Sequence, residues 1–493
     1  MSFDQNFILS NSKDFLPEII IIMTLIIILI IELVDENSVW LFRTTIGALF
    51  IASSILLLQW FFPTSNTFFS NYHINGLTTT FRCLLTLSVT FSVLISKEYV
   101  QRAEIPIAEF LIFLLTATIG GLFLCGANDL ITLFVALECL SLSSYLLAGC
   151  SKMDIRSNEA AMKYLLMGGA SSAILAYGFS WLYGLSGGKL QFYDVFLNLT
   201  HNTASPLAIG LALVCTLVGI CFKLSIVPFH QWAPDVYEGS PTPVVAFFSV
   251  GSKAASFALM IRVLTLIFPL VQVTWEPIIS SLAIGTMILG NLIALTQSNI
   301  KRLLAYSSIS QAGYLMIGIL YGQTLGYTPV VLYMLIYIFM NIGAFACIIQ
   351  LSLRTGTDQI RDYAGLYFKD PVLTTCLTIC LLSLAGIPPF AGFFVKLYIF
   401  WCGWKVGLYP IVYVGLITSV ISIYYYLRII KIMITKEKQE ISSYVKDYTV
   451  LPFSWIPRSS LELSIALCVL LSTTLGFILN PLISLTNYTL SVI

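Results

Sequence analysis

Charged residues are scarce in this chain of 493 residues. They make up 10% of the sequence, whereas hydrophobic residues make up 58% and the mean hydropathy is +0.91. A typical soluble domain carries about 25% charged residues. Such a surface cannot be kept in water, so the sequence predicts that the surrounding solvent is lipid. The formal net charge of +1 argues against a nucleic-acid partner or an acidic substrate.

Motifs for redox centres and nucleotides are also missing. The eleven cysteines lie in apolar stretches or at their ends and form no C-x-x-C pair, whereas an iron–sulfur cluster needs several clustered thiolates. Neither G-x-G-x-x-G nor G-x-x-x-x-G-K-[ST] occurs. We therefore expect this chain to bind no cofactor. If it serves a redox reaction, the electrons travel through other proteins.

What the sequence does contain is long apolar runs. Fourteen stretches approach or exceed the roughly 20 residues that a membrane-spanning helix needs. The first, from Leu16 to Leu33, has an acidic flank and no small-residue cleavage site, so we interpret it as a retained span. The sequence thus predicts an all-α polytopic membrane protein with about fourteen transmembrane helices and no soluble domain. The predicted spans are 16–33, 39–61, 76–95, 106–125, 128–149, 157–184, 205–229, 241–268, 276–297, 300–322, 327–353, 371–400, 408–433 and 461–484.

Lysine and arginine collect in alternate loops, which sets the predicted orientation. The loops on one side hold nearly all of them, including a basic run from Arg428 to Arg458, and the other side holds only Lys13, Lys189 and Lys405. Both termini are then predicted on the face opposite the basic one.

Two predicted spans are interrupted by proline. Span seven ends in the segment from Lys223 to His230, which contains Pro228, and span twelve contains Pro388-Pro389. Proline removes a backbone donor, and lipid tolerates such breaks only where protein or a water-filled cavity covers them. Each break falls in the fourth helix of a five-helix set.

Because five is an odd number, the second set must be inserted upside down relative to the first. This is the pattern of transporters built from inverted repeats. The predicted segments are an N-terminal three-helix segment, a first five-helix repeat, a second inverted repeat, and a basic loop with the C-terminal helix. Their boundaries are 1–105, 106–268, 269–433 and 434–493.

Four ionisable residues lie deep inside predicted spans. Glu138 is ten residues into span five, and Lys253 is the midpoint of span eight. Lys223 lies one turn before the first break, and Lys396 follows the second break by two turns. Charge at such depth is costly and functional by default, with a structural ion pair as the competing interpretation. A further set lies near span ends and can snorkel to the headgroups: Arg43, Arg82, Arg262, Glu32, Glu109 and Asp129.

Proton transport gives these residue types a physical role. A lysine taken out of water has its charged form disfavoured, and a nearby carboxylate opposes this effect. Glu138 and Lys223 would therefore form a switch, from which a row of lysines passes the proton on. Lys163 could tune its neighbours or snorkel, and His230 could bridge Lys223 and Lys253 or be a satisfied polar residue. Hydroxyl and amide groups in spans ten and eleven could complete the path, although polar contacts between helices explain them equally well: Tyr306, Ser307, Ser308, Ser310, Tyr314, Tyr333, Tyr337 and Asn341.

The segment from Phe222 to Pro243 resembles the signature of the antiporter-like subunits of the respiratory complex I family. Its ending, from Tyr237 to Pro243, is similar to that of the N-type subunits. The resemblance covers nearly the whole chain, and longer strings are similar to the plastid members of this family, which belong to an NAD(P)H–plastoquinone oxidoreductase. These strings are Cys125 to Thr132, Asn158 to Ser172, Trp181 to Gly188, Arg354 to Tyr367 and Trp401 to Trp404.

The resemblance implies a proton channel in two inverted five-helix bundles. The family's glutamate maps onto Glu138, its channel lysines onto Lys223 and Lys253, its exit-side residue onto Lys396, and its modulating lysine onto Lys163. It also implies other membrane-arm and redox subunits as partners, which carry the iron–sulfur clusters and plastoquinone. Electrons would come from reduced ferredoxin or NAD(P)H, and protons would be pumped into the thylakoid lumen of a chloroplast.

Several alternatives stay open at this point. A stand-alone cation/proton antiporter shares the helical core but works without quinone reductase subunits. A mitochondrial counterpart of the inner membrane, or a cyanobacterial thylakoid protein, would share the general layout. A purely structural component with an inactive channel is disfavoured by the complete row of ionisable residues.

Overall fold

The computed structural model describes residues 14–34, 38–61, 66–68, 71–201, 205–435 and 459–490. Apolar runs form helices because lipid offers backbone groups no hydrogen-bond partner, so each helix must satisfy its own. Residues 436–458, which belong to the predicted basic loop, lie outside the described residues. The N-terminal elements are α2 (Leu16–Val34), α3 (Ser38–Phe61), β1 (Asn66–Phe68), β2 (Tyr72–Ile74) and α4 (Gly76–Arg102).

Two bodies of helices follow this N-terminal part. The first comprises α5 (Ile107–Gly126), α6 (Leu130–Ala148), α7 (Ile155–Leu185), α8 (Phe192–His201), α9 (Pro206–Leu224), α10 (Trp232–Gly239) and α11 (Thr242–Leu266). The second comprises η1 (Pro269–Val271), α12 (Gln272–Ala294), α13 (Ile300–Leu325), α14 (Thr328–Thr355), η2 (Ile360–Tyr363), α15 (Leu366–Lys369), α16 (Pro371–Ala385), α17 (Ala391–Lys405) and α18 (Tyr409–Ile434). The chain ends with α20 (Ser460–Thr474) and α21 (Leu479–Leu490).

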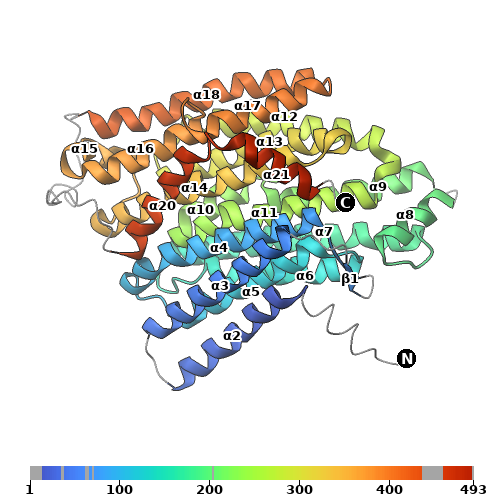
Figure 1. Ribbon diagram of the computed structural model, residues 1–493, viewed down its shortest axis with the longest axis horizontal. Helices are drawn as coiled ribbons and strands as arrows, with labels where there is room; N and C mark the ends of the chain where they lie inside the picture. The colour runs from blue at the N-terminus through green and yellow to red at the C-terminus, as the bar shows by residue number, and fades with distance from the viewer. Residues whose placement is uncertain are drawn as a thin grey trace.

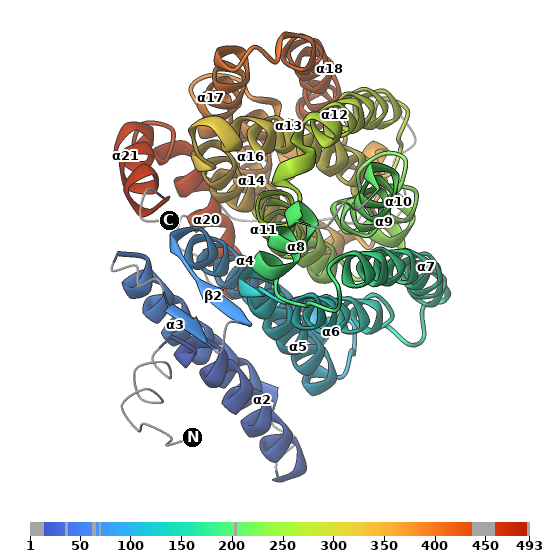
Figure 2. The same ribbon diagram turned by 90° about the vertical axis from the view of Figure 1, so that its right-hand side faces the viewer.

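The helices lie side by side in one bundle whose centre is formed by α11 and α14. In Figures 1 and 2, α2 and α3 lie at one edge and α17 and α18 at the opposite edge. The apolar window of α11 is 100% buried, whereas that of α2 is 28% buried. The outer helices therefore expose apolar side chains, as lipid-facing helices do. The short hairpin of β1 and β2 pairs Thr67 with His73.

Twelve described helices are long and apolar enough to cross a membrane, or thirteen if the bent pair α20 and α21 is one span. Predicted span twelve is instead two fifteen-residue helices, α16 and α17. At 1.5 Å per residue each is roughly 22 Å long, too short to cross a hydrocarbon core of about 30 Å alone. The polytopic helical fold is thus as predicted, and the count of fourteen spans stays a prediction.

The predicted span over 461–484 is not one straight helix, and whether the bent pair is a single broken span stays a prediction. The structure bends the chain by 91° between α20 and α21. Gly476 lies at this bend, and a Cβ there would come within 3.0 Å of the Ala391 Cα at the start of α17. The close approach needs a residue without a side chain. Sequence periodicity gives no sign of it, because apolar residues continue through the bend.

The two helical bodies share two backbone features. Before α6, Asp129 forms an isolated antiparallel bridge with Gln191, and before α13, Asn299 forms the same bridge with Gln359. In both bodies the partner follows the next long helix. Both broken spans also end their first half in a left-handed residue, Ser225 (φ 55°) after α9 and Gly386 (φ 80°) after α16. These matches support a relation between the two bodies, while their inverted insertion and the predicted segment boundaries stay predictions.

Candidate proton-relay site

Lys223 lies in a buried pocket of aromatic rings at the first break. It is in the last turn of α9, and its Nζ lies 5.1 Å from the ring centre of Tyr145 and 5.5 Å from that of Tyr164. At these distances the negative faces of the rings attract an ammonium group. Among the described residues, the Nζ has no hydrogen-bond partner. Rings rather than acceptors therefore surround this amine.

The second half of the broken span closes this pocket. Trp232, the first residue of α10, stacks on Tyr164 with ring centres 4.4 Å apart. Its Nε1 donates a hydrogen bond of 3.0 Å to the Phe222 carbonyl, which also accepts one from the Ser225 amide at the end of α9. The indole thus helps to cap the broken helix, and the lysine does not have to.

Glu138 stands on α6, three and seven residues before Ser141 and Tyr145, so all three share one helix face. Ser141 Oγ donates a hydrogen bond of 3.0 Å to Glu138 Oε2, and Oε1 is buried without a partner among the described residues. Tyr145, on this same face, has its ring centre 5.1 Å from Lys223 Nζ. No ion pair within 4.0 Å joins Glu138 and Lys223 in the described part of the chain. The carboxylate therefore shares a helix face with a ring beside the lysine and does not hold the lysine itself.

Lys253 occupies the middle of α11, where its side chain is buried. Its Nζ donates hydrogen bonds to two oxygens of Ser308 on α13, the carbonyl at 2.7 Å and the hydroxyl at 3.1 Å. This contact links the first helical body to the second. An acceptor that is neutral stabilises the ammonium less than a carboxylate would, so Lys253 is not locked in the charged state.

Lys396 follows the second break and is also buried. Its Nζ donates hydrogen bonds to the carbonyls of Leu384 (2.7 Å) and Ala385 (3.1 Å), the last residues of α16. It also lies 5.5 Å from the ring centre of Tyr314. Here the lysine itself caps the broken helix, the task that Trp232 performs at the first break.

Buried hydroxyl and amide groups extend from Lys396. The Tyr314 hydroxyl accepts a hydrogen bond from Asn291 Nδ2 (3.3 Å) and donates to Thr418 Oγ1 (3.4 Å). Tyr425 donates to Asn291 Oδ1 (3.1 Å). Of the groups predicted for the path, Ser308 and Tyr314 thus lie beside lysines. Two more pairs lie in the same core: Tyr333 donates to Gln311, and Asn341 Nδ2 donates to the Tyr337 hydroxyl at 2.8 Å.

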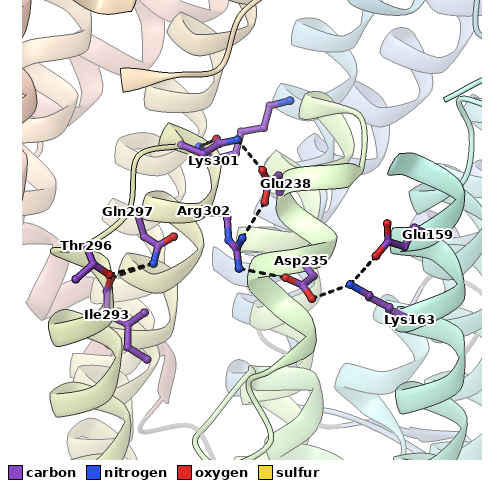
Figure 3. Close-up of polar contacts among 10 residues, drawn as sticks. Glu159, Lys163, Asp235, Glu238, Ile293, Thr296, Gln297, Lys301 and Arg302 are labelled. Carbon is purple, nitrogen blue, oxygen red and sulfur yellow. Dashed lines mark hydrogen bonds and ion pairs between the residues drawn. The ribbon is translucent and has the colours of Figure 1, made fainter. Parts of the chain in front are cut away.

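Lys163 lies outside the buried row, in a network of charges at the ends of α7, α10 and α13 (Figure 3). Its Nζ pairs with Glu159 (2.8 Å) and Asp235 (3.1 Å). Arg302 pairs with the same Asp235 (3.3 Å) and with Glu238 (3.2 Å). Because Lys163 precedes Tyr164 in the chain, this network fixes α10 beside the aromatic pocket. The sequence analysis did not predict a role for Asp235, although this residue lies in the segment from Phe222 to Pro243 that carries the family resemblance.

His230 lies in the turn between α9 and α10 and is partly buried. Its Nδ1 is buried and has no hydrogen-bond partner among the described residues. None of the described contacts joins it to Lys223 or Lys253. Its role as a bridge therefore stays a prediction. Within the described part of the chain, no group of three or more His, Cys, Asp or Glu side chains could hold a metal ion.

Two arginines expected to snorkel are instead buried in protein. Arg82 donates to both carboxylate oxygens of Glu18 on α2, at 2.5 and 2.6 Å, and both side chains are almost fully buried. Arg262 donates to the carbonyls of His73 and Cys125, each at 3.3 Å. Burial and the adjacent Arg262 guanidinium lower the pKa of His73 from its ordinary value.

Asp129, also expected to snorkel, is buried at the start of α6. The other residues of this set agree better with the expectation. Arg43 and Glu32 are exposed, and Glu109 makes an exposed ion pair of 2.8 Å with Lys152. The position of a charged residue along a predicted span therefore does not reveal whether its side chain contacts lipid headgroups or is buried in protein.

Broken helices around buried lysines in a polytopic bundle define the class of antiporter-like membrane subunits. The sequence model of the family "NADH:quinone oxidoreductase/Mrp antiporter, TM" matches residues 127–422. The chain belongs to this family. Two curated relatives, from Zygnema circumcarinatum and Chaetosphaeridium globosum, are both called NAD(P)H-quinone oxidoreductase subunit 2, chloroplastic. The first is 59% identical over 99% of this chain and 98% of its own length, and the second 57% identical over 96% of each.

Solved structures have the same fold. A chain of respiratory complex I from Thermus thermophilus with bound aureothin is 30% identical, with a TM-score of 0.78, over 95% of this chain and 99% of that one. A chain of the archaeal membrane-bound sulfane sulfur reductase has a TM-score of 0.84 at 21% identity, over 97% of each chain. A chain of the Mrp complex from Dietzia sp. DQ12-45-1b has a TM-score of 0.81 at 18% identity, over 96% of each. The last two likenesses concern the fold alone.

Proposed function

We propose that this chain is a proton-translocating membrane-arm subunit of a chloroplast NAD(P)H–quinone oxidoreductase. The likeness to two chloroplast relatives supports the complex, and the buried lysines support the proton path. The observation that carries the proposal is that Lys223, Lys253 and Lys396 are buried without an ion pair in the described part of the chain. A buried charge without a counter-charge is easily neutralised, which a proton carrier requires.

In the proposed path, Glu138 controls the first step. With Glu138 ionised and close, the Lys223 ammonium is favoured and keeps its proton. When the carboxylate is neutralised or drawn away, only aromatic rings remain around the amine, and it releases the proton. Lys253 and then Lys396 receive it in turn, through hydroxyl groups and water. Lys163 acts through Asp235, by holding α10 over the pocket, and His230 takes part at the break.

The partners and the compartment belong to the same proposal. The chain would work beside other membrane-arm and redox subunits, which carry the iron–sulfur clusters and bind plastoquinone and the electron donor, ferredoxin or NAD(P)H. It would lie in the thylakoid membrane with its basic face toward the stroma. Native-gel separation of gently solubilised membranes, followed by mass spectrometry, tests this part. Migration alone or with transporter subunits only would instead favour a stand-alone antiporter.

The relay is tested by K223M in the whole complex. We expect electron transfer to quinone to continue while the number of protons pumped per electron falls, because methionine fills the pocket but carries no proton. K405M is the matched control, since Lys405 also lies over an aromatic ring, at 3.7 Å from Trp401, but belongs to no buried row. E138Q should act like K223M. An unchanged proton-to-electron ratio in assembled K223M complex would exclude this path.

A further inference from the structure

A cavity of about 1120 Å³ opens at the ends of α12 and α18, beside η2. The loop after α12 supplies three polar residues to its lining, Thr296, Gln297 and Ser298. All these segments belong to the ends and loops that the charge pattern places on the basic side of the membrane. The cavity therefore lies at the depth of lipid headgroups.

The charged residues that line this cavity within the described ranges are all positive. They are Arg361 from η2 and Arg428 and Lys431 from α18, and no described carboxylate lines it. Arg428 and Lys431 are three residues apart, so they share a helix face. Arg428 donates to the Leu295 carbonyl at 3.3 Å. None of the three cations makes a salt bridge with a described residue, so this cluster lacks a counter-charge within the described part of the chain.

Apolar side chains continue from the cavity onto the outer face of α18. Tyr424 and Leu427 line the cavity and are exposed. Further along the same helix, Tyr413, Leu416 and Val420 are exposed as well. Exposed apolar side chains along a peripheral membrane helix face acyl chains. The cavity thus joins a basic, hydrogen-bonding end to a lipid-facing stripe.

We propose that this cavity is a binding site for the phosphate-bearing headgroup of an anionic glycerolipid. The three cations and the polar loop bind the phosphate, and the acyl chains lie along the exposed face of α18. Basic pockets between helices on the cytoplasmic side of membranes bind anionic headgroups in this way. The apolar stripe favours a lipid over an acidic protein segment, which would leave that stripe uncovered. This site does not depend on the proton path.

The test uses the whole complex, purified in detergent, stripped of lipid and titrated with phosphatidylglycerol or phosphatidylcholine. Bound lipid is counted by native mass spectrometry. The triple variant R361Q/R428Q/K431Q removes the charge while keeping a polar side chain at each position. The matched control is K97Q/R102Q/R156Q. It neutralises three cations of the same basic face that do not line the cavity, and Arg102 likewise donates to a helix-end carbonyl, that of Leu353, at 3.2 Å.

We expect the parent and the control variant to retain phosphatidylglycerol. The affinity of the cavity variant for this lipid should fall by about fivefold for each neutralised cation. Phosphatidylcholine should bind equally to all three. Equal retention by cavity variant and parent would overturn the proposal. So would competition by inorganic phosphate alone at the same concentration, which would indicate a simple anion site. Loss of a neighbouring subunit from the variant with lipid retained would indicate an acidic protein partner instead.

Discussion

The two broken spans follow the same backbone path but treat their lysines differently. The segment Ser225-Ile-Val-Pro-Phe and the segment Gly386-Ile-Pro-Pro-Phe both begin in a left-handed residue. At the first break an indole takes the helix-end carbonyl, and Lys223 is left among aromatic rings. At the second break Lys396 takes the carbonyls itself. One lysine is thus free to change its contacts, and the other is anchored.

The largest expected effect comes from the close approach of α16 and α17, the two helices of the second broken span. A Cβ on Gly392 would lie 1.9 Å from the Ser383 carbonyl oxygen, so G392A must push α17 away from α16. Overpacking of this kind costs about 1–3 kcal/mol, and backbone cannot move aside as a side chain can. We expect little of this chain in the assembled complex on native gels. Q231A, an exposed position at the first break, is the control and should assemble normally.

A smaller effect separates the two lysines by their contribution to stability. K396M leaves the carbonyls of Leu384 and Ala385 without their donor, whereas K223M removes a buried charge that makes no hydrogen bond. An unsatisfied buried acceptor costs about 1–3 kcal/mol. K396M complex should therefore unfold at a lower temperature than K223M complex. Equal unfolding midpoints for the two variants would contradict the distinction between a free and an anchored lysine.

The smallest effect should come from the indole that caps the first break. W232F keeps a ring that can stack on Tyr164 but cannot donate to the Phe222 carbonyl, a loss of about 1 kcal/mol. We expect Lys223 to turn toward that carbonyl, as Lys396 does at the second break, and the proton-to-electron ratio to fall. W401F, which alters an exposed indole, is the control and should change neither the orientation of Lys223 nor the proton-to-electron ratio. An unchanged proton-to-electron ratio in W232F would show that proton transfer does not require Lys223 to be without a hydrogen-bond partner.

Sequence reasoning located the charged row and both breaks because lipid gives such residues few alternatives. Glu138 shares a helix face with Tyr145, whose ring lies beside Lys223, while the switch between Glu138 and Lys223 stays a prediction. The aromatic lining of the Lys223 pocket was not predicted. Tyr145, Tyr164 and Trp232 come from three different helices, and aromatic residues are common in apolar spans, so nothing in the sequence indicates that these three meet. The spacing of Glu138, Ser141 and Tyr145 places them on one helix face, and this spacing could have indicated that Tyr145 lines the pocket.

The misses near span ends have a different cause. The positions of Arg82 and Arg262 near predicted span ends favour contact with headgroups, but the packing of other helices buries both side chains in protein. The bend after α20 depends on how closely Gly476 approaches Ala391, a contact between segments far apart in the sequence. Long-range packing of this kind leaves no periodic pattern in one sequence.

The buried pair of Glu18 and Arg82 has a consequence for how the protein is made. The two residues are 64 positions apart, and ribosomes add about 5–20 residues per second. Glu18 therefore leaves the ribosome roughly 3 to 13 s before its partner does. During that interval α2 cannot settle in its final place, because its carboxylate has no counter-charge inside the membrane. Of these two helices, α2 is thus synthesised earlier but is not fixed earlier, because it docks only after α4 has been inserted.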